Sequence, residues 1–427
     1  MSEAGSTVSP MRRARLTACS LVLGTAVVGC TNGDDTSPPP TDAVTTTSTS
    51  PPPGGDNRLT IGFLLPRADD SALGEGVNAA ARQAVDQINE AGGVIGRRVR
   101  VVAADEGASS ADTQRGYQQL ADASVDAVIG PTSSLTALSD LDTIVGDGVL
   151  ACSPTASALA LDEIPDEGLF FRTIPSDSLQ AVAIAELAEG TGAQNASIVY
   201  VDDAYGRGLA QAVTEALQAR SIAVSQMGVA SVERNLTAEA LSLLAGKGDV
   251  AIILGDDVRG PRLLTAMGDA IRDDPALPVP DVIVNDAMRQ PDSPEVMRDL
   301  PGVLRTSLQG VSPMATPTLD DQPGGLFGTN AFDCVTTIAL AAEQAQSDRP
   351  LAIAAEMQGV SSGGSVCRSY DTCRDLIAAG RNIDYEGPGG VLELDETGDS
   401  SRARFDVFGF DSNGIDESLQ QRIFSSD

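Results

Sequence analysis

The sequence predicts an α/β protein built from two doubly wound lobes. From Arg58 onward, apolar runs of strand length alternate with helical patterns, which is typical of repeated βαβ units. Hydrophobic residues make up 42% of the 427, which is enough for more than one buried core. Aromatic residues make up only 3% and Trp is absent, so the cores must consist of Ala, Val, Leu and Ile. That composition suits parallel sheets covered by Ala-rich helices.

The first lobe begins with a clear strand, loop and helix. An apolar strand leads through a polar loop into a helix whose apolar residues recur at helical spacing and which ends at Gly92-Gly93. Three further strands follow, separated by helical patterns at 112–122 and 135–147. The four strands expected in this sheet are 59–65, 97–105, 125–131 and 148–154.

A second set of strands and helices begins after Arg172. Its expected strands are 196–202, 222–229, 249–255 and 281–286, with helices at 206–221 and 236–247. After Asp286 the pattern becomes irregular, with helices near 327–346 and 351–358 and a hairpin of 391–396 with 403–410. Open α/β sheets bind ligands at the carboxyl ends of their strands, so two such halves predict a ligand crevice.

Charge and composition exclude several classes of function. The chain has 28 Lys plus Arg against 60 Asp plus Glu, a net charge of −32, so it offers no basic groove for nucleic acid. Most of this acidity is expected on a solvated surface. His is absent, which removes the commonest general base and the commonest metal ligand, and excludes a Ser-His-Asp triad. We therefore expect neither an enzyme nor a metal or cofactor, and Gly74-x-Gly76 lacks the third Gly of a dinucleotide motif.

Residues 1–30 have the anatomy of an export signal. The cationic segment MRRAR begins at Met11, and an apolar run from about Leu16 to Val28 follows it, before Gly29-Cys30. The run is too short to cross a bilayer of roughly 30 Å as a stable helix. Translation could begin at Met1 or at Met11.

The tetrapeptide Val27-Val28-Gly29-Cys30 resembles the lipobox of bacterial lipoproteins. This resemblance implies that Cys30 becomes the lipid-bearing first residue; the alternative is an ordinary signal peptide that contains a Cys. Residues 31–57 are rich in Pro, Thr, Ser and Gly and predict a disordered tether. The folded part is then expected outside the cytoplasmic membrane, at its outer face and in an oxidising space.

The remaining cysteines are interpreted in that oxidising setting. Cys367 and Cys373 lie close together where a loop leads into a helix, so we expect a disulfide between them. Cys152 lies in an apolar strand and Cys334 in an Ala-rich helix, so each is predicted to be a buried small hydrophobic residue without a bond.

Six segments in this order resemble the type I periplasmic binding proteins, specifically the branched-chain amino acid binding group that serves ABC importers. The resemblance spans about Leu59 to Phe410. Its most specific parts are INEAGGVIGR, VIGPTSSLTALS, GVLACSPTAS, VDDAYGRGLA, NAFDCVTTIALAA and GPGGVLELDETGD. The family implies two Rossmann-like lobes joined by a three-stranded hinge. Lobe 1 would comprise 58–174 plus 310–387, and lobe 2 would comprise 175–309 plus 388–427.

Hydroxyl groups in lobe 1 are the first candidate ligand contacts. In the loop that leads into a helix start at Ser133 and Ser134, backbone N–H groups and hydroxyls, including that of Thr136, can hold a carboxylate. The family resemblance implies that Ser134 and Ser157 contact the ligand carboxylate, and that the Thr155 carbonyl accepts from its ammonium. These side chains can also cap helices, and the two roles share one geometry.

Lobe 2 should complete the site. Tyr205 matches a family Tyr that closes over the ligand, and a lobe-2 acid completes the ammonium site in that family. Asp256, Asp257 or Asp286 could supply that acid, but no Glu stands where the family has it, and Leu73 replaces an aromatic residue of the family's first loop. A ligand such as an amide or another small polar molecule is therefore an open alternative to an amino acid.

The resemblance implies a monomeric solute receptor that closes on its ligand and docks an ABC permease in the membrane. The same module could instead act as a sensor that reports its ligand without transport. The sequence does not separate these two functions.

Overall fold

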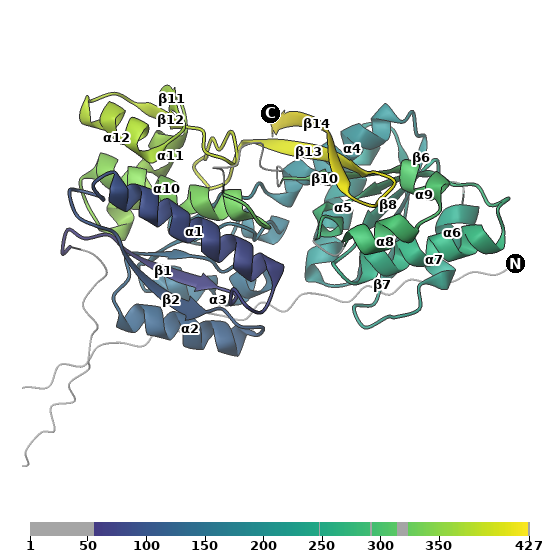
Figure 1. Cartoon of the computed structure of the whole chain (residues 1–427), viewed down its shortest axis with the longest axis horizontal. Coiled ribbons are helices and arrows are strands. Elements are labelled where there is room, and N and C mark those ends of the chain that lie inside the picture. The colour runs from purple at the N-terminus through teal and green to yellow at the C-terminus, as the bar shows by residue number, and fades with distance from the viewer. Residues whose placement is uncertain (1–54, 247, 291–292, 314–322, 426–427) are drawn as a thin grey trace, which may run out of the picture. The chain divides into compact units, whose positions relative to one another are not determined.

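A computed structural model of the chain describes residues 55–246, 248–290, 293–313 and 323–425. It confirms the predicted fold class, because strands and helices alternate along the chain and most of the strands pair in parallel within two large sheets (Figure 1). The predicted export signal, Cys30 and nearly all of the predicted tether lie outside the described residues. Within them, no helix is both long enough and apolar enough to cross a membrane.

The first sheet has five parallel strands in the order β2-β1-β3-β4-β5. This order reverses direction beside β1, as in doubly wound folds. Its strands are β1 (Thr60–Leu65), β2 (Arg100–Asp105), β3 (Ala127–Ile129), β4 (Leu150–Ser153) and β5 (Phe170–Arg172). Between them lie α1 (Ala72–Glu90), α2 (Ser110–Asp122), α3 (Ser134–Gly146) and the 3₁₀ turn η1 (Leu159–Leu161).

The second sheet has seven strands in the order β14-β13-β10-β9-β8-β6-β7. The five strands from β7 to β10 pair in parallel, whereas β13 and β14 pair antiparallel. Its strands are β6 (Asn195–Val201), β7 (Ala223–Val229), β8 (Val250–Leu254), β9 (Asp281–Val284), β10 (Leu308–Ser312), β13 (Arg402–Phe410) and β14 (Asp416–Ser425). Its helices are α4 (Asp177–Gly190), α5 (Ala204–Ala219), α6 (Thr237–Ala245), α7 (Arg259–Asp273), α8 (Ser293–Asp299) and α9 (Gly302–Thr306), with the turn η2 (Asp286–Met288).

The segment that follows β10 packs against the first core. Helix α10 packs along α1, and its buried residues belong to the same hydrophobic cluster as β1, β3 and β4 (Figure 1). The returning segment contains α10 (Gly328–Ala345), α11 (Pro350–Ser361), β11 (Ser365–Cys367), α12 (Tyr370–Ala378) and β12 (Ile383–Tyr385). The exact lobe boundaries given above stay a prediction.

One of the two strands predicted for the hairpin at the end of the chain is wrong. Residues 391–396 form no strand, and Leu394 makes only an isolated bridge to Ser400. The Asp395 carboxylate accepts the N–H groups of Thr397 (2.8 Å) and Asp399 (3.3 Å), which holds this segment in a turn. The hairpin forms instead between β13 and the more polar β14.

A second prediction, which concerns Cys152 and Cys334, is wrong. The two residues form a disulfide with a Cα–Cα distance of 5.8 Å, whereas the sequence predicted that both are unbonded. Both are fully buried, as predicted, because the bond lies between β4 and α10 within the first core. Cys367 and Cys373 form the other disulfide, between β11 and α12.

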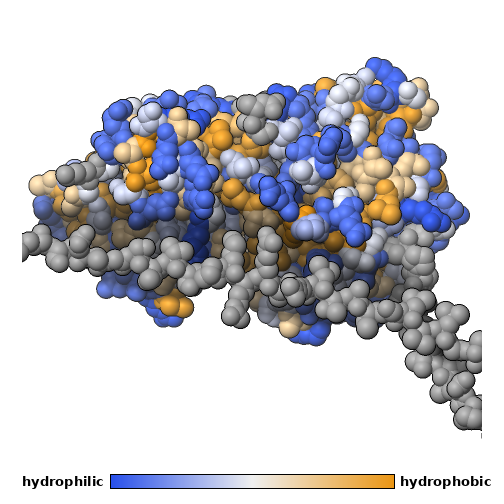
Figure 2. All heavy atoms as spheres, turned by 180° about the vertical axis from the view of Figure 1, so that it is seen from behind, coloured by the Kyte–Doolittle hydropathy of each residue, from blue (hydrophilic) through white to orange (hydrophobic). Residues whose placement is uncertain are grey.

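Figure 2 shows hydrophilic residues spread over much of one face, with smaller apolar areas between them. This distribution is what a chain with a net charge of −32 is expected to present to solvent.

Candidate ligand-binding site

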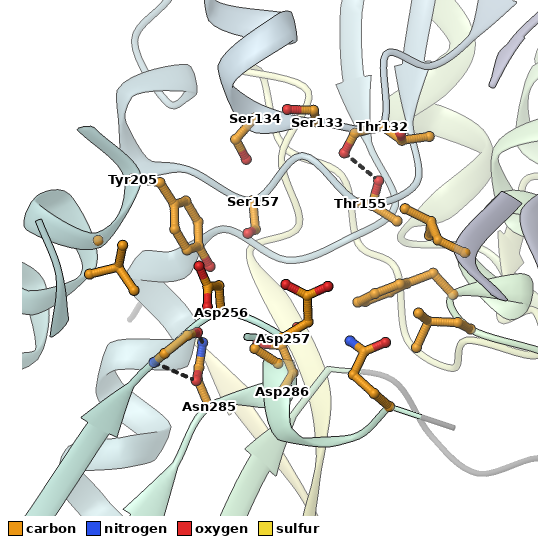
Figure 3. Close-up of a pocket in the computed structure, with 18 of the residues that line it drawn as sticks. Thr132, Ser133, Ser134, Thr155, Ser157, Tyr205, Asp256, Asp257, Asn285 and Asp286 are labelled. Atoms are coloured by element: carbon orange, nitrogen blue, oxygen red, sulfur yellow. Dashed lines mark hydrogen bonds between the residues drawn. The ribbon is translucent and has the colours of Figure 1, made fainter. Parts of the chain in front are cut away.

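A cavity of about 700 Å³ lies at the carboxyl ends of strands from both sheets. Eight of the nine residues that the sequence offered as ligand contacts line it, and Thr136 does not: the eight are Ser133, Ser134, Thr155, Ser157, Tyr205, Asp256, Asp257 and Asp286. Figure 3 shows the Ser and Thr side chains on one side of the cavity and the Asp side chains on the other. We call these two sides the hydroxyl wall (Thr132, Ser133, Ser134, Thr155 and Ser157) and the carboxylate wall (Asp203, Asp256, Asp257 and Asp286).

The hydroxyl wall is built where β3 and β4 end. Ser133 caps α3, because its side chain accepts the N–H of Thr136 at 3.4 Å. The Ser134 hydroxyl accepts the N–H of Ala158 at 3.2 Å, which leaves its own proton for another acceptor. The Thr155 hydroxyl donates to the carbonyl of Thr132 at 2.6 Å and so ties the two loops together.

The start of α3 already holds a carboxylate from the protein itself. Glu106 is buried and accepts the N–H groups of Thr132 (2.9 Å) and Ser133 (3.1 Å) and the hydroxyl of Thr136 (3.0 Å). Burial raises the pKa of Glu106, and these hydrogen bonds lower it in part. Two donors that the sequence suggested for a ligand carboxylate, the Ser133 N–H and the Thr136 hydroxyl, therefore bind Glu106 instead.

The carboxylate wall follows β6, β8 and β9. Asp203 caps α5 by accepting the N–H of Gly206 at 2.8 Å. Asp256 accepts the N–H of Arg259 at 2.6 Å and forms an ion pair with its guanidinium at 2.6 Å. Asn285 fixes the adjacent strand ends, because its side chain bonds both the N–H (3.2 Å) and the carbonyl (3.0 Å) of Gly255 (Figure 3).

Asp286 lies at the start of η2, directly after Asn285. One of its oxygens accepts from the Gln180 side chain at 3.0 Å. Burial raises the pKa of Asp286, and the bond from Gln180 lowers it in part. Asp256 is thus paired with the guanidinium of Arg259, whereas the hydrogen bond that Asp286 accepts comes from a neutral amide.

Asp177 is a residue that the sequence analysis missed. It is the first residue of α4, only 1% of its surface is exposed, and one of its carboxylate oxygens has no hydrogen-bond partner among the described residues. Burial raises its pKa well above the usual range, and the nearby charge of Asp286 raises it further. In the sequence, Asp177 follows the helix cap Ser176 and resembles an ordinary first-turn acid, so no local signal separates the two roles.

Tyr205 connects Asp177 to the cavity. It lies half-buried in the first turn of α5 and interacts through its hydroxyl with Ser157 and Asp177. Burial raises the pKa of Tyr205 well above its usual range, and the charges of Asp177 and Asp286 add to the rise. The tyrosine hydroxyl therefore stays protonated, and its single proton is donated to Asp177.

The rest of the cavity lining is largely apolar. Leu73 comes from the first turn of α1, Leu326 and Phe327 precede α10, and Val201 and Leu254 end β6 and β8. These side chains can receive the apolar part of a ligand. Among the described residues, no group of three or more His, Cys, Asp or Glu side chains is arranged to hold a metal ion.

Comparison with known proteins agrees with this architecture. A family described as periplasmic binding protein matches residues 58–270. The chemotactic signal transduction system substrate-binding protein BasB of Halobacterium salinarum is 29% identical over 79% of this chain and 83% of its own length. The leucine-, isoleucine-, valine-, threonine-, and alanine-binding protein of Pseudomonas aeruginosa is 25% identical over 78% of this chain and 85% of its own length.

Solved structures share the fold at lower identity. The leucine-binding protein LivK of Thermotoga maritima has a TM-score of 0.66 at 16% identity, over 86% of this chain and 99% of its own. The branched-chain amino acid transporter substrate-binding protein LivJ of Streptococcus pneumoniae, in complex with isoleucine, has a TM-score of 0.66 at 17% identity, over 86% of this chain and 99% of its own. The chain therefore belongs to the periplasmic binding protein family and has the two-lobed fold of its type I members.

Proposed function

We propose that this chain is an extracytoplasmic solute-binding lipoprotein of an ABC importer, and that it captures an amino acid in the cavity described above. The proposal is supported by a hydroxyl wall that faces a carboxylate wall across the cavity. It is also supported by the buried Asp177, because one of its carboxylate oxygens has no hydrogen-bond partner among the described residues. An amino acid presents one anion, one cation and a side chain, and the cavity offers a matching surface for each.

The ammonium group would bind at Asp286 and Asp177. A buried carboxylate without a full set of partners is costly, and a cationic ligand would remove that cost by supplying charge and hydrogen-bond donors together. The Thr155 carbonyl is the third acceptor that the family resemblance suggests. Tyr205 and Ser157, which contact Asp177, would hold its carboxylate toward the ligand.

The carboxylate group would bind at Ser134. Its hydroxyl proton is available, because its oxygen already accepts the N–H of Ala158. Ser157 is the second donor suggested by the resemblance, although its hydroxyl also interacts with Asp177. The apolar part of the ligand would lie against Leu73, Leu326 and Phe327.

Arg172 would keep this arrangement in place. Its fully buried guanidinium donates to the carbonyl of Ala158 (3.1 Å) and pairs with Asp399 and Asp162 at 2.5 and 2.6 Å. Asp399 lies in the turn before β13, so this ion pair joins the ligand loop to a segment that enters the second sheet. Crossings near Ile174, Gly310 and Gly387 would form the hinge for closure.

A binding experiment tests this proposal. Amino acids and small amides are screened by thermal shift, and affinities for the best ligands are measured by calorimetry. Ser134→Ala should weaken binding by about tenfold, since a charge-assisted hydrogen bond is worth roughly 1.5–3 kcal/mol. Ser139→Ala is the matched control, because Ser139 lies on the exposed face of the same helix. Equal affinity of both variants would remove Ser134 from the site, and a screen without any ligand would contradict the proposal.

A sensor is the second candidate, because the name of the relative BasB places that protein in chemotactic signal transduction. Deletion of the gene distinguishes the two functions. Loss of uptake of the radiolabelled ligand supports an importer, whereas intact uptake with a lost behavioural response supports a sensor.

A further inference from the structure

Glu106 directly follows β2, and only 1% of its surface is exposed. One of its carboxylate oxygens accepts the N–H groups of Thr132 (3.0 Å) and Ser133 (3.1 Å) and the hydroxyl of Thr136 (3.0 Å). The other oxygen accepts the N–H (2.9 Å) and the hydroxyl (2.5 Å) of Thr132. A backbone N–H can only donate, so both oxygens act as acceptors. The donors at the start of α3 are therefore occupied by a carboxylate that the protein itself supplies.

The hydrogen bonds to Glu106 also fix the loop that follows β4. The carbonyl of Thr132 accepts the hydroxyl of Thr155 at 2.6 Å (Figure 3). The carbonyl of the preceding residue, Pro131, accepts the hydroxyl of Ser153 at 2.6 Å. The loops after β3 and β4, which together carry the hydroxyl wall, are therefore held in place through one buried carboxylate.

Ser134 lies between two of these contacts. Its neighbour Ser133 donates an N–H to Glu106, and Thr136, two residues further along α3, donates a hydroxyl. The Ser134 hydroxyl in turn accepts the N–H of Ala158 at 3.2 Å. The direction of the Ser134 side chain therefore depends on a helical turn that Glu106 holds on both sides of it.

We infer that Glu106 is the positioning residue of the hydroxyl wall: it occupies the start of α3 in place of a ligand carboxylate, and it fixes the Ser134 hydroxyl in the direction that such a carboxylate requires. This inference rests on the proposed function, because it concerns the group that is proposed to bind the ligand carboxylate. Glu106 does not itself line the cavity, so it acts on the ligand only through other residues.

Replacement of Glu106 by Ala tests the occupied helix start without any amino acid. The change removes a group the size of one acetate ion and frees the donors of Thr132, Ser133 and Thr136. Acetate at about 100 mM should therefore raise the Tm of Glu106→Ala by about 2 °C or more, and that of the wild type by less than about half as much. Acetamide and chloride at the same concentration are the controls, because neither is a carboxylate. Equal shifts in the two proteins, or equal shifts with acetate and acetamide, would overturn the inference and leave the proposed function intact.

Calorimetry tests the positioning role, with leucine or, in its place, the amino acid that binds most tightly in the screen. Glu106→Gln should weaken binding by about tenfold, because the Gln side chain would direct its own N–H groups at donors of the loop. In the double variant with Ser134→Ala, the loss should stay close to that of the weaker-binding single variant, since both changes remove the same contact. Losses that multiply, or unchanged binding in Glu106→Gln, would contradict the positioning role while the proposed function stands.

Glu343→Gln is the matched control for a loss of stability alone. Glu343 is also buried, at 8% exposed, and accepts the N–H of Ile95 at 2.7 Å, but neither residue lines the cavity. This variant should lower the Tm and leave the affinity within about twofold of the wild type. An equal loss of affinity in both Gln variants would show that Glu106 has only a structural role. Failure of every amino acid to bind the wild type would overturn the proposed function and the positioning role together.

Discussion

At the scale of single residues, the proposed ligand chemistry depends on buried carboxylates. Folding places Asp177 at the first position of α4, behind Asp286, where its charge is poorly solvated. A buried charge of this kind lowers the stability of the empty protein, and a cationic ligand can recover that cost on binding.

Asp177→Asn should therefore have two opposite effects. It should weaken binding of an amino acid by about tenfold or more, because the ammonium loses a carboxylate, and it should raise the Tm of the empty protein at pH 8. Calorimetry and thermal unfolding measure the two effects on one sample. A variant that loses stability and affinity together would show that Asp177 has only a structural role.

Asp126 predicts a pH dependence of stability that is separate from the site. It is 3% exposed, accepts the N–H of Thr60 at 2.7 Å, and burial raises its pKa to about 7. Because this folded-state pKa lies above the ordinary value of 3.8, Asp126 stabilises the fold at low pH, and this contribution is lost as the pH rises toward 7. Asp126→Asn should therefore reduce the fall in unfolding free energy between pH 5 and pH 8 by at most roughly 3 kcal/mol, because about two pH units separate pH 5 from the folded-state pKa and each is worth about 1.4 kcal/mol.

Urea denaturation at several pH values measures this difference. Asp142→Asn, on the exposed face of α3, is the control for a simple change in net charge. An unchanged pH profile in Asp126→Asn would show that Asp126 is ionised in the folded protein throughout this range.

Several residues that line the cavity could be predicted from the sequence, because the carboxyl ends of parallel strands meet at one edge of a sheet. Ser134, Ser157 and Asp286 each follow a strand that apolar runs had marked. Asp177 could not be found in this way, since it follows a helix cap and its proposed role depends on Asp286, more than a hundred residues away in sequence. The hydrogen bonds that Glu106 accepts at the start of α3 likewise depend on a tertiary contact, which the local sequence does not show.

At the scale of elements, the strands marked by apolar runs were predictable, whereas β5 and β14 were not. The strands β1 and β8 lie within predicted ranges, whereas β5 has only three residues and β14 is polar. Such strands form because a neighbouring strand offers unpaired backbone groups, which is information that local sequence lacks. Helix α4 was missed because its residues are apolar on most sides, so no amphipathic pattern marks it.

The Cys152–Cys334 disulfide was missed for the same reason, since its partners are 182 residues apart. Cross-linking so long a loop restricts the unfolded chain more than the Cys367–Cys373 bond, whose partners are 6 residues apart. Replacing both Cys152 and Cys334 by Ala should lower the unfolding free energy by about 2–3 kcal/mol more than replacing Cys367 and Cys373. Chemical denaturation of the two double variants checks this order, and an equal or reversed cost would contradict it.

At the scale of the whole molecule, two sheets supply opposite chemistry to one cavity. The five-stranded sheet contributes hydroxyl groups, and the seven-stranded sheet contributes carboxylates. A ligand with both an anionic and a cationic group would therefore favour the closed arrangement of the lobes, which is the property that a permease or a sensor partner can detect.

The proposed lipid anchor also belongs to this scale. If Cys30 carries acyl chains, Cys30→Ser should release the protein from the membrane fraction without changing its ligand affinity. Fractionation of cells and mass spectrometry of the mature amino terminus measure both the location and the acylation. A Cys30→Ser variant that is still acylated would contradict the lipobox interpretation.

The most direct test of the account is a crystal structure with the tightest-binding amino acid from the screen. We predict that the ligand nitrogen lies within about 3 Å of the Asp286 carboxylate and beside Asp177, with the ligand carboxylate at the Ser134 hydroxyl. A ligand found outside this cavity, or one whose carboxylate faces the Asp side chains, would contradict the central claim.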